Sequence, residues 1–61
     1  MQEQFEVIEG NGFYNIVYDK ISKRYCIYDI KDHCYLDDTY TTDLQCAEKT
    51  MENLSEELTI S

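Results

Sequence analysis

Basic side chains and long apolar runs are scarce in this 61-residue chain. Five Lys and Arg face 13 Asp and Glu, which gives a formal net charge of −8. A surface of this sign repels nucleic-acid phosphates and anionic membranes. No apolar run approaches the roughly 20 residues that a membrane-spanning helix needs. We therefore expect neither nucleic acid nor a membrane as a direct partner.

Cysteine is also too sparse for a disulfide-stabilised or zinc-stabilised fold. Cys26, Cys34 and Cys46 are an odd set, whereas small secreted scaffolds carry even sets of four or more. The set predicts reduced thiols in a cytoplasmic protein. Zinc modules show Cys-x₂₋₄-Cys pairs, which this chain lacks. His33, adjacent to Cys34, cannot easily chelate the same ion. We expect no metal and no cofactor.

A catalytic constellation is lacking as well. A nucleophile needs an oriented base beside it, and His33 is the only histidine. Successive strand residues point to opposite faces, so His33 is not expected to couple to Cys34. Cys26 could meet His33 across a hairpin, which is a weak pattern. A chain of this length also leaves little room for a substrate pocket. We expect a protein that is not an enzyme.

Apolar and aromatic residues are plentiful. Hydrophobic residues make up 43% of the chain, with six Tyr and two Phe among them. An acidic disordered tail would have few aromatic and β-branched residues. The composition therefore predicts a folded protein, a single domain over residues 1–61.

Period-two alternation predicts three strands, over residues 4–8, 13–19 and 25–30. Asn11-Gly12 stands between the first two, and Asn-Gly is a strong hairpin signal because both residues accept positive φ. Residues 34–36 predict a short fourth strand at an edge. Residues 37–41 are polar and predict a link to the next element.

A helix is predicted over residues 42–58. Thr42 is a good N-cap, and Gln45 three residues later completes a capping box. Apolar side chains then recur every three or four residues on one stripe: Leu44, Ala47, Met51, Leu54 and Leu58. The predicted fold class is α+β, a three- or four-stranded antiparallel sheet (about 4–36) packed on one C-terminal α-helix.

One helix can cover only one face of such a sheet. Both faces of residues 13–19 and 25–30 are rich in Tyr, Ile and Val. We therefore expect an aromatic patch on the uncovered face, since such patches often mark interaction sites. The alternatives are that a homodimer or the folded-over N-terminus covers this face.

Acidic residues form the most informative pattern. Glu48, Glu52 and Glu56 recur every four residues on one helix face, about 6 Å apart along the axis. This distance is close to the phosphate spacing of a nucleic-acid strand, and like charges at i,i+4 destabilise a helix. The residues predicted to bind a partner are these three carboxylates, three that extend the row and two tyrosine anchors: Glu48, Glu52, Glu56, Asp37, Asp38, Asp43, Tyr35 and Tyr40. The alternative is an ordinary solvated helix face.

Two resemblances accompany these patterns. The first rests on Tyr18-Asp19, on residues 25–29 and on Tyr40-Thr41-Thr42 before the helix that contains Ala47. With these segments the chain resembles the three-strand-plus-helix layout of integrase arm-binding and AP2-type DNA-binding domains. Those domains read DNA with basic residues on the sheet, and the −8 chain offers few, so the resemblance implies layout and not activity. In size and charge the chain resembles small acidic proteins of phages and mobile elements, of the anti-restriction or anti-CRISPR type.

The second resemblance implies an inhibitor that presents DNA-like charge. We therefore expect a non-catalytic acidic protein-binding module, in its narrower form an inhibitor that mimics nucleic-acid charge to block a basic site on a host enzyme. The expected partner is a basic protein surface, such as that of a nucleic-acid-binding enzyme. The alternative is a structural or homodimeric module without mimicry. A third reading is weak nucleic-acid binding through the basic residues Lys20, Lys23, Arg24 and Lys31.

Overall fold

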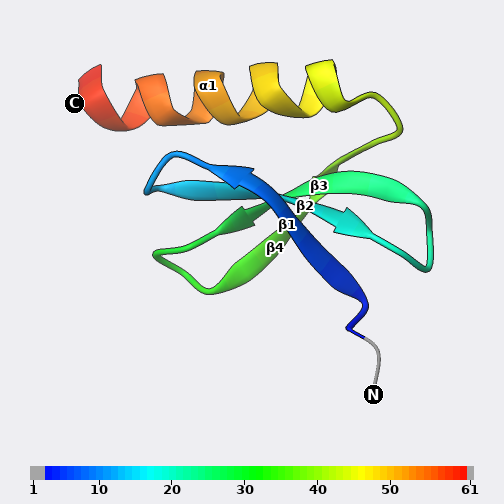
Figure 1. Cartoon of the computed structure of the whole chain (residues 1–61). Coiled ribbons are helices and arrows are strands. Elements are labelled where there is room, and N and C mark those ends of the chain that lie inside the picture. The colour runs from blue at the N-terminus through cyan, green and yellow to red at the C-terminus, as the bar shows by residue number, and fades with distance from the viewer. Residues whose placement is uncertain (1–2, 61) are drawn as a thin grey trace.

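Four antiparallel strands form one sheet in chain order, and a single helix packs on one of its faces (Figure 1). The computed structural model describes residues 3–60, and side chains from 3 to 58. The elements are β1 (Phe5–Gly10), β2 (Tyr14–Asp19), β3 (Arg24–Asp29), β4 (Cys34–Thr41) and α1 (Leu44–Ile60). The predicted α+β class, an antiparallel sheet on one C-terminal helix, is confirmed.

The first hairpin turn is held by an asparagine side chain. Asn11 Oδ1 accepts hydrogen bonds from the backbone N–H groups of Phe13 and Tyr14, each at 3.0 Å. Gly12 has a φ of 91°, whereas Asn11 does not have a positive φ. The Asn-Gly signal therefore located the turn correctly, but Asn11 acts through its side chain, as Asx turns do, and only Gly12 uses the left-handed backbone region.

The next two hairpins use aspartate in the same way. Asp19 Oδ1 accepts from Ile21 N–H, and ten residues later Asp29 Oδ1 accepts from Asp32 N–H at 3.1 Å. Each turn then passes through one residue with positive φ, Lys23 at 60° and His33 at 55°. Short polar side chains that bond the backbone two or three residues on favour such turns.

The fourth strand is longer than the sequence indicates. β4 continues to Thr41, through residues predicted to be a polar link. Its register with β3 shifts between Tyr25 and Ile27, and Thr39 bridges the irregularity. Thr39 Oγ1 accepts from Ile27 N–H at 2.9 Å and donates to the Leu36 carbonyl at 2.6 Å. A side chain therefore replaces ladder hydrogen bonds at this bulge, and the strand can resume beyond it.

The helix begins two residues later than predicted. The carboxylate of Asp43 accepts from Gln45 N–H at 2.9 Å, so Asp43 is the N-cap. The prediction that Thr42 caps the helix with Gln45 in a capping box was wrong. Thr41 Oγ1 accepts from Asp43 N–H at 3.1 Å and orients the cap. Aspartate caps as well as threonine does, because its oxygen satisfies the same orphan amides.

The main core lies between the sheet and α1, on what we call the helix side. Ile16 and Ile27 face each other across β2 and β3 and are fully buried. The helix stripe packs against them through Ala47 and Met51, with Leu44 and Leu54 partly buried beside these. Leu58, the last predicted member of the stripe, is 45% exposed. The packing of the stripe therefore weakens toward the C-terminal end of α1.

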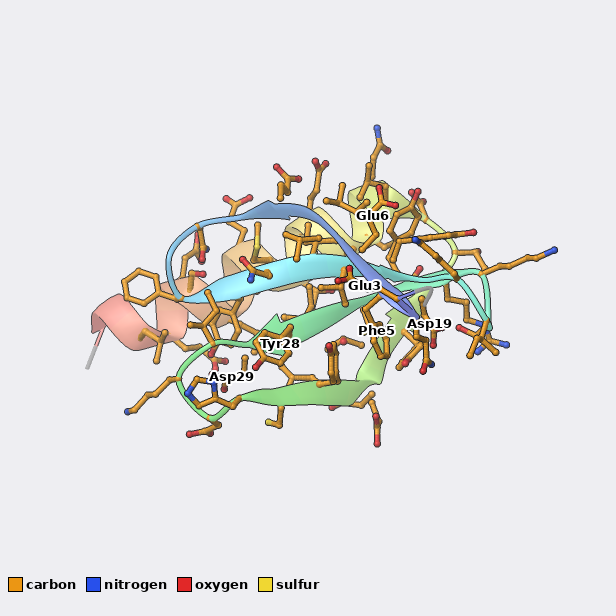
Figure 2. All side chains as sticks on the ribbon, turned by 60° about the horizontal axis from the view of Figure 1, so that its bottom comes forward. Glu3, Phe5, Glu6, Asp19, Tyr28 and Asp29 are labelled. Atoms are coloured by element: carbon orange, nitrogen blue, oxygen red, sulfur yellow. The ribbon has the colours of Figure 1, made fainter. Side chains whose placement is uncertain are left out.

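The opposite side of the sheet, the far face, is largely covered by its own edge strands. Phe5 of β1 stacks on Tyr35 of β4 with ring centroids 4.1 Å apart, although these strands lie at opposite edges. The sheet is therefore strongly curled (Figure 2). Val17 and Cys26, which pair across β2 and β3, are buried on this side. The expected open aromatic patch was wrong for most of this face. Part of the N-terminal strand covers it, as one alternative foresaw.

Candidate docking groove

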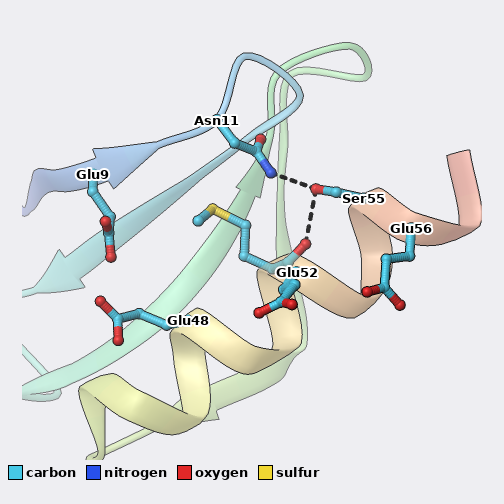
Figure 3. A pocket seen from close by; sticks show the side chains of 7 residues that line it. Glu9, Asn11, Glu48, Glu52, Ser55 and Glu56 are labelled. Atoms are coloured by element: carbon cyan, nitrogen blue, oxygen red, sulfur yellow. Dashed lines mark hydrogen bonds between the residues drawn. The ribbon is translucent and has the colours of Figure 1, made fainter. Parts of the chain in front are cut away.

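A groove opens where the helix leaves the sheet uncovered. The backbone of α1 lies close to β2, β3 and β4 but not to β1, and a groove of about 520 Å³ lies between β1 and the helix. Four carboxylates, two neutral polar side chains and one methionine line it: Glu9, Asn11, Glu48, Met51, Glu52, Ser55 and Glu56 (Figure 3). Met51 is mostly buried and belongs to the core cluster. The groove thus combines an apolar patch with an acidic lining.

One side of the groove is anchored by a polar contact between loop and helix. Asn11 Nδ2 donates to Ser55 Oγ, and Ser55 Oγ donates in turn to the Met51 carbonyl at 2.8 Å (Figure 3). Asn11 therefore orders its own turn and joins it to α1. This junction ties the turn between β1 and β2 to α1 beside the groove.

The two walls present carboxylates to each other. Glu9 of β1 faces Glu48 of α1 (Figure 3). The pKa of Glu48 is raised, first by a hydrogen bond with Glu9 and second by the negative charge of Glu9. Among residues 3–58 the one ion pair joins Lys20 to Glu6 at 3.8 Å, outside the groove. Glu9, Glu48 and Glu52 thus have no cationic partner within the described part of the chain. No cation of the described chain therefore offsets the repulsion between Glu9 and Glu48.

Titration of Glu48 should report this repulsion directly. We expect its carboxyl to titrate at a higher pH than a free glutamate, because Glu9 favours the protonated form. In a Glu9→Gln variant the pKa of Glu48 should fall toward its ordinary value. Carbon-detected NMR of the side-chain carboxyls measures both. An unchanged Glu48 titration in the variant would show that the two walls do not interact.

The structure brings together only part of the predicted binding set. Glu48, Glu52 and Glu56 line one groove, as their spacing indicates, and Glu9 joins them from β1. Sequence reasoning missed Glu9 because nothing local shows which strand lies beside the helix. Glu9 pairs with the core residue Ile16, and paired residues share a face of the sheet. The Glu9 side chain therefore lies on the helix side.

The other predicted carboxylates lie elsewhere. Asp37 and Asp38 are exposed on β4, and Asp43 is engaged as the helix cap. None of the three lines the groove. The predicted extension of the acidic row therefore does not form one continuous surface with Glu48, Glu52 and Glu56.

The two predicted tyrosine anchors also lie apart from the groove. Tyr35 packs between Phe5 and Tyr28 on the far face and is 40% exposed. Tyr40 donates its hydroxyl to Asp19 Oδ2 at 3.1 Å. Burial, followed by this hydrogen bond, raises the pKa of Tyr40. Tyr40 thus stabilises a buried carboxylate, whereas Tyr35 leaves part of its ring exposed to solvent on the far face.

The cysteine and histidine side chains do not line the groove. Cys26 is buried, Cys34 and Cys46 are exposed, and none forms a disulfide. His33 occupies a turn, with Nδ1 3.4 Å from the Tyr28 hydroxyl. Within residues 3–58, no three His, Cys, Asp or Glu side chains converge closely enough to hold a metal ion. The carboxylates of the groove therefore form no such cluster among the described residues.

The fold is a small two-layer α+β protein with a groove between β1 and α1 that is lined mainly by carboxylates. Comparison with known protein families, with curated protein sequences and with solved structures finds no match for this chain. In the described residues, no helix has the length and apolar character needed to cross a membrane.

Proposed function

We propose that this chain is a non-catalytic acidic module that binds a basic protein surface through the groove between β1 and α1. The observation that carries the proposal is the set Glu9, Glu48 and Glu52, which face the groove without a cation from the described chain. A bound Lys or Arg would supply the missing positive charge.

A protein partner fits this groove better than an isolated ion. The carboxylates are too dispersed to chelate a metal, and Met51 adds an apolar patch beside them. Lys and Arg side chains match such a surface, because they lay an apolar stem along hydrocarbon and keep a charged head among polar groups. The net charge of −8 would also steer a basic partner toward the molecule before contact.

The narrower form of the proposal is an inhibitor that occupies the nucleic-acid site of a host enzyme. The helical row Glu48, Glu52 and Glu56 supports it through a rise of about 6 Å between successive carboxylates. Glu9 adds a second wall, so a protruding basic segment that enters the groove satisfies more carboxylates than a flat basic surface does. Competition between this chain and DNA for a basic nuclease would test the mimicry separately from the binding.

Neutralising the groove should weaken binding while leaving the fold intact. In a Glu9→Gln, Glu48→Gln, Glu52→Gln variant we expect slower association with poly-L-lysine and a shallower salt dependence, because steering charge is lost. The melting temperature should stay the same or rise, since the change relieves repulsions worth roughly 0.2–0.5 kcal/mol per i,i+4 pair. Surface plasmon resonance at several salt concentrations and thermal melts provide the two readouts.

A matched control separates the groove from net charge. The variant Asp37→Asn, Asp38→Asn, Glu57→Gln removes the same three charges from exposed positions that do not line the groove. It should retain most of the parent affinity for poly-L-lysine. If both triple variants lose affinity equally, the groove is not the binding site and only the overall charge matters.

A further inference from the structure

The strand that borders the groove has an open backbone edge. β1 is an edge strand of the sheet. Lys20 N–H donates to the Gln4 carbonyl at 2.8 Å, and antiparallel ladders alternate bonded and non-bonded pairs. The backbone N–H and C=O groups of Phe5 and Val7 therefore point away from β2. Val7 is 61% exposed, so the strand is open to solvent at this position.

The two sides of β1 differ in chemistry. Glu6 pairs with Tyr18 and Glu9 with Ile16, which places both carboxylates on the helix side. Val7 pairs with Val17 and lies on the far side of the strand. An additional strand beside β1 would therefore meet carboxylates and the groove on one side, and exposed apolar surface on the other. Cross-strand pairs stabilise a sheet when their charges are opposite and their apolar groups meet.

We infer that β1 binds an extended segment of a partner protein as a fifth strand, with Lys or Arg at alternate positions facing the groove and β-branched residues between them. This inference rests on the proposed function and specifies the partner's chemistry. Main-chain hydrogen bonds to Phe5 and Val7 align the segment, and its basic side chains reach Glu9 and Glu48.

A second copy of this chain fits the same edge poorly. Pairing two β1 strands would bring Glu6 and Glu9 of each copy together, and like charges opposite one another destabilise a sheet. Charge complementarity therefore selects a basic strand from another protein.

Alternating peptides test this inference. The probe is a heptapeptide that alternates lysine and valine, compared with an isomer of the same composition whose lysines are consecutive. We expect the alternating peptide to bind the full chain about tenfold more tightly, the equivalent of one or two well-formed hydrogen bonds. Two N-methylated forms of the alternating peptide, one methylated at the lysine amides and one at the valine amides, should differ in affinity for the chain. Only one of the two sets of amides faces β1 in an added strand.

A protein variant provides an independent readout. Val7→Pro removes an amide that β2 does not use, and proline is tolerated on edge strands where the N–H faces solvent. It should abolish the preference for the alternating peptide, whereas Val7→Thr should preserve it. Circular dichroism checks that each variant folds, and if Val7→Pro does not, the N-methylated peptides decide the matter with the parent chain.

The outcomes separate this inference from the proposed function. Suppose the two isomers bind equally and neither methylation matters, while the groove triple variant still loses binding. Strand addition is then wrong and the acidic module stands. Suppose instead that alternation and methylation matter but the groove carboxylates do not. The proposed charge recognition is then wrong. Self-association of the chain through β1, seen as a dimer mass that Val7→Pro abolishes, would also overturn the inference.

Discussion

Replacing Ile27 by alanine should unfold much of the protein at physiological temperature. Ile27 is fully buried on the helix side, between Ile16 of β2 and Leu36 of β4 in the strand register. Truncating a buried isoleucine to alanine costs about 2–5 kcal/mol through lost transfer energy and a residual cavity. A domain of this size has a total stability of roughly 3–9 kcal/mol. Urea titration followed by circular dichroism measures the loss.

The same substitution at an exposed isoleucine provides the control. Ile21 lies in the second hairpin turn and is 75% exposed, so Ile21→Ala should change stability by less than about 0.5 kcal/mol. Ile27→Val should fall between, at about 0.5–1.5 kcal/mol. Equal effects of Ile27→Ala and Ile21→Ala would mean that the core is not where the structure places it.

Replacing Asp19 by alanine should lower the melting temperature by about 10 °C or more, since four donors lose their shared buried acceptor. Asp19 is buried on the far face, and its carboxylate accepts from four groups: Ile21 N–H at 2.9 Å, Ser22 N–H at 3.3 Å, Gln4 Nε2 at 3.3 Å and the Tyr40 hydroxyl at 3.1 Å. It thus joins the start of the chain, the second turn and β4.

Asp29→Ala is the matched control, because Asp29 occupies the corresponding position in the third hairpin. Its carboxylate accepts from one exposed backbone amide, that of Asp32, so its loss should cost much less. Differential scanning calorimetry of the two variants makes the comparison. Melting temperatures that fall equally would show that Asp19 contributes only its turn and not the wider network.

The same network predicts a pH dependence. Burial raises the pKa of Asp19, but hydrogen bonds led by Ile21 N–H and Gln4 outweigh it, so the pKa lies below its ordinary value. Because the pKa of Asp19 is lower in the folded state than in the unfolded state, its contribution to the free energy of unfolding is fully present above about pH 4. This contribution is lost as the pH falls through the folded-state pKa. Asp19→Asn, which cannot ionise, should lack this part of the acid sensitivity.

Much of the fold follows from local patterns in the sequence. Period-two alternation predicted the strands that carry Ile16 and Ile27, because strand side chains alternate wherever the strand runs, and the pairing of β2 with β3 then placed both on one side of the sheet. The stripe through Ala47 and Met51 assigned the buried helix face for the same reason, at a period near 3.6 residues. The helical carboxylates Glu48 and Glu52 share a face by the same geometry, so part of the candidate groove was predictable.

The remaining features depend on contacts between residues far apart in the chain, which no local pattern contains. The extension of β4 requires Thr39 to meet Ile27, and the covering of the far face requires Phe5 to meet Tyr35. The groove itself exists because α1 crosses β2, β3 and β4 but not β1, which brings Glu9 opposite Glu48. The sequence by itself therefore determined the first three strands, the helix and the face that the helix buries, since these depend on backbone periodicity. Only the tertiary structure decided which acidic residues face one another, because that depends on the curl of the sheet and the path of the helix across it.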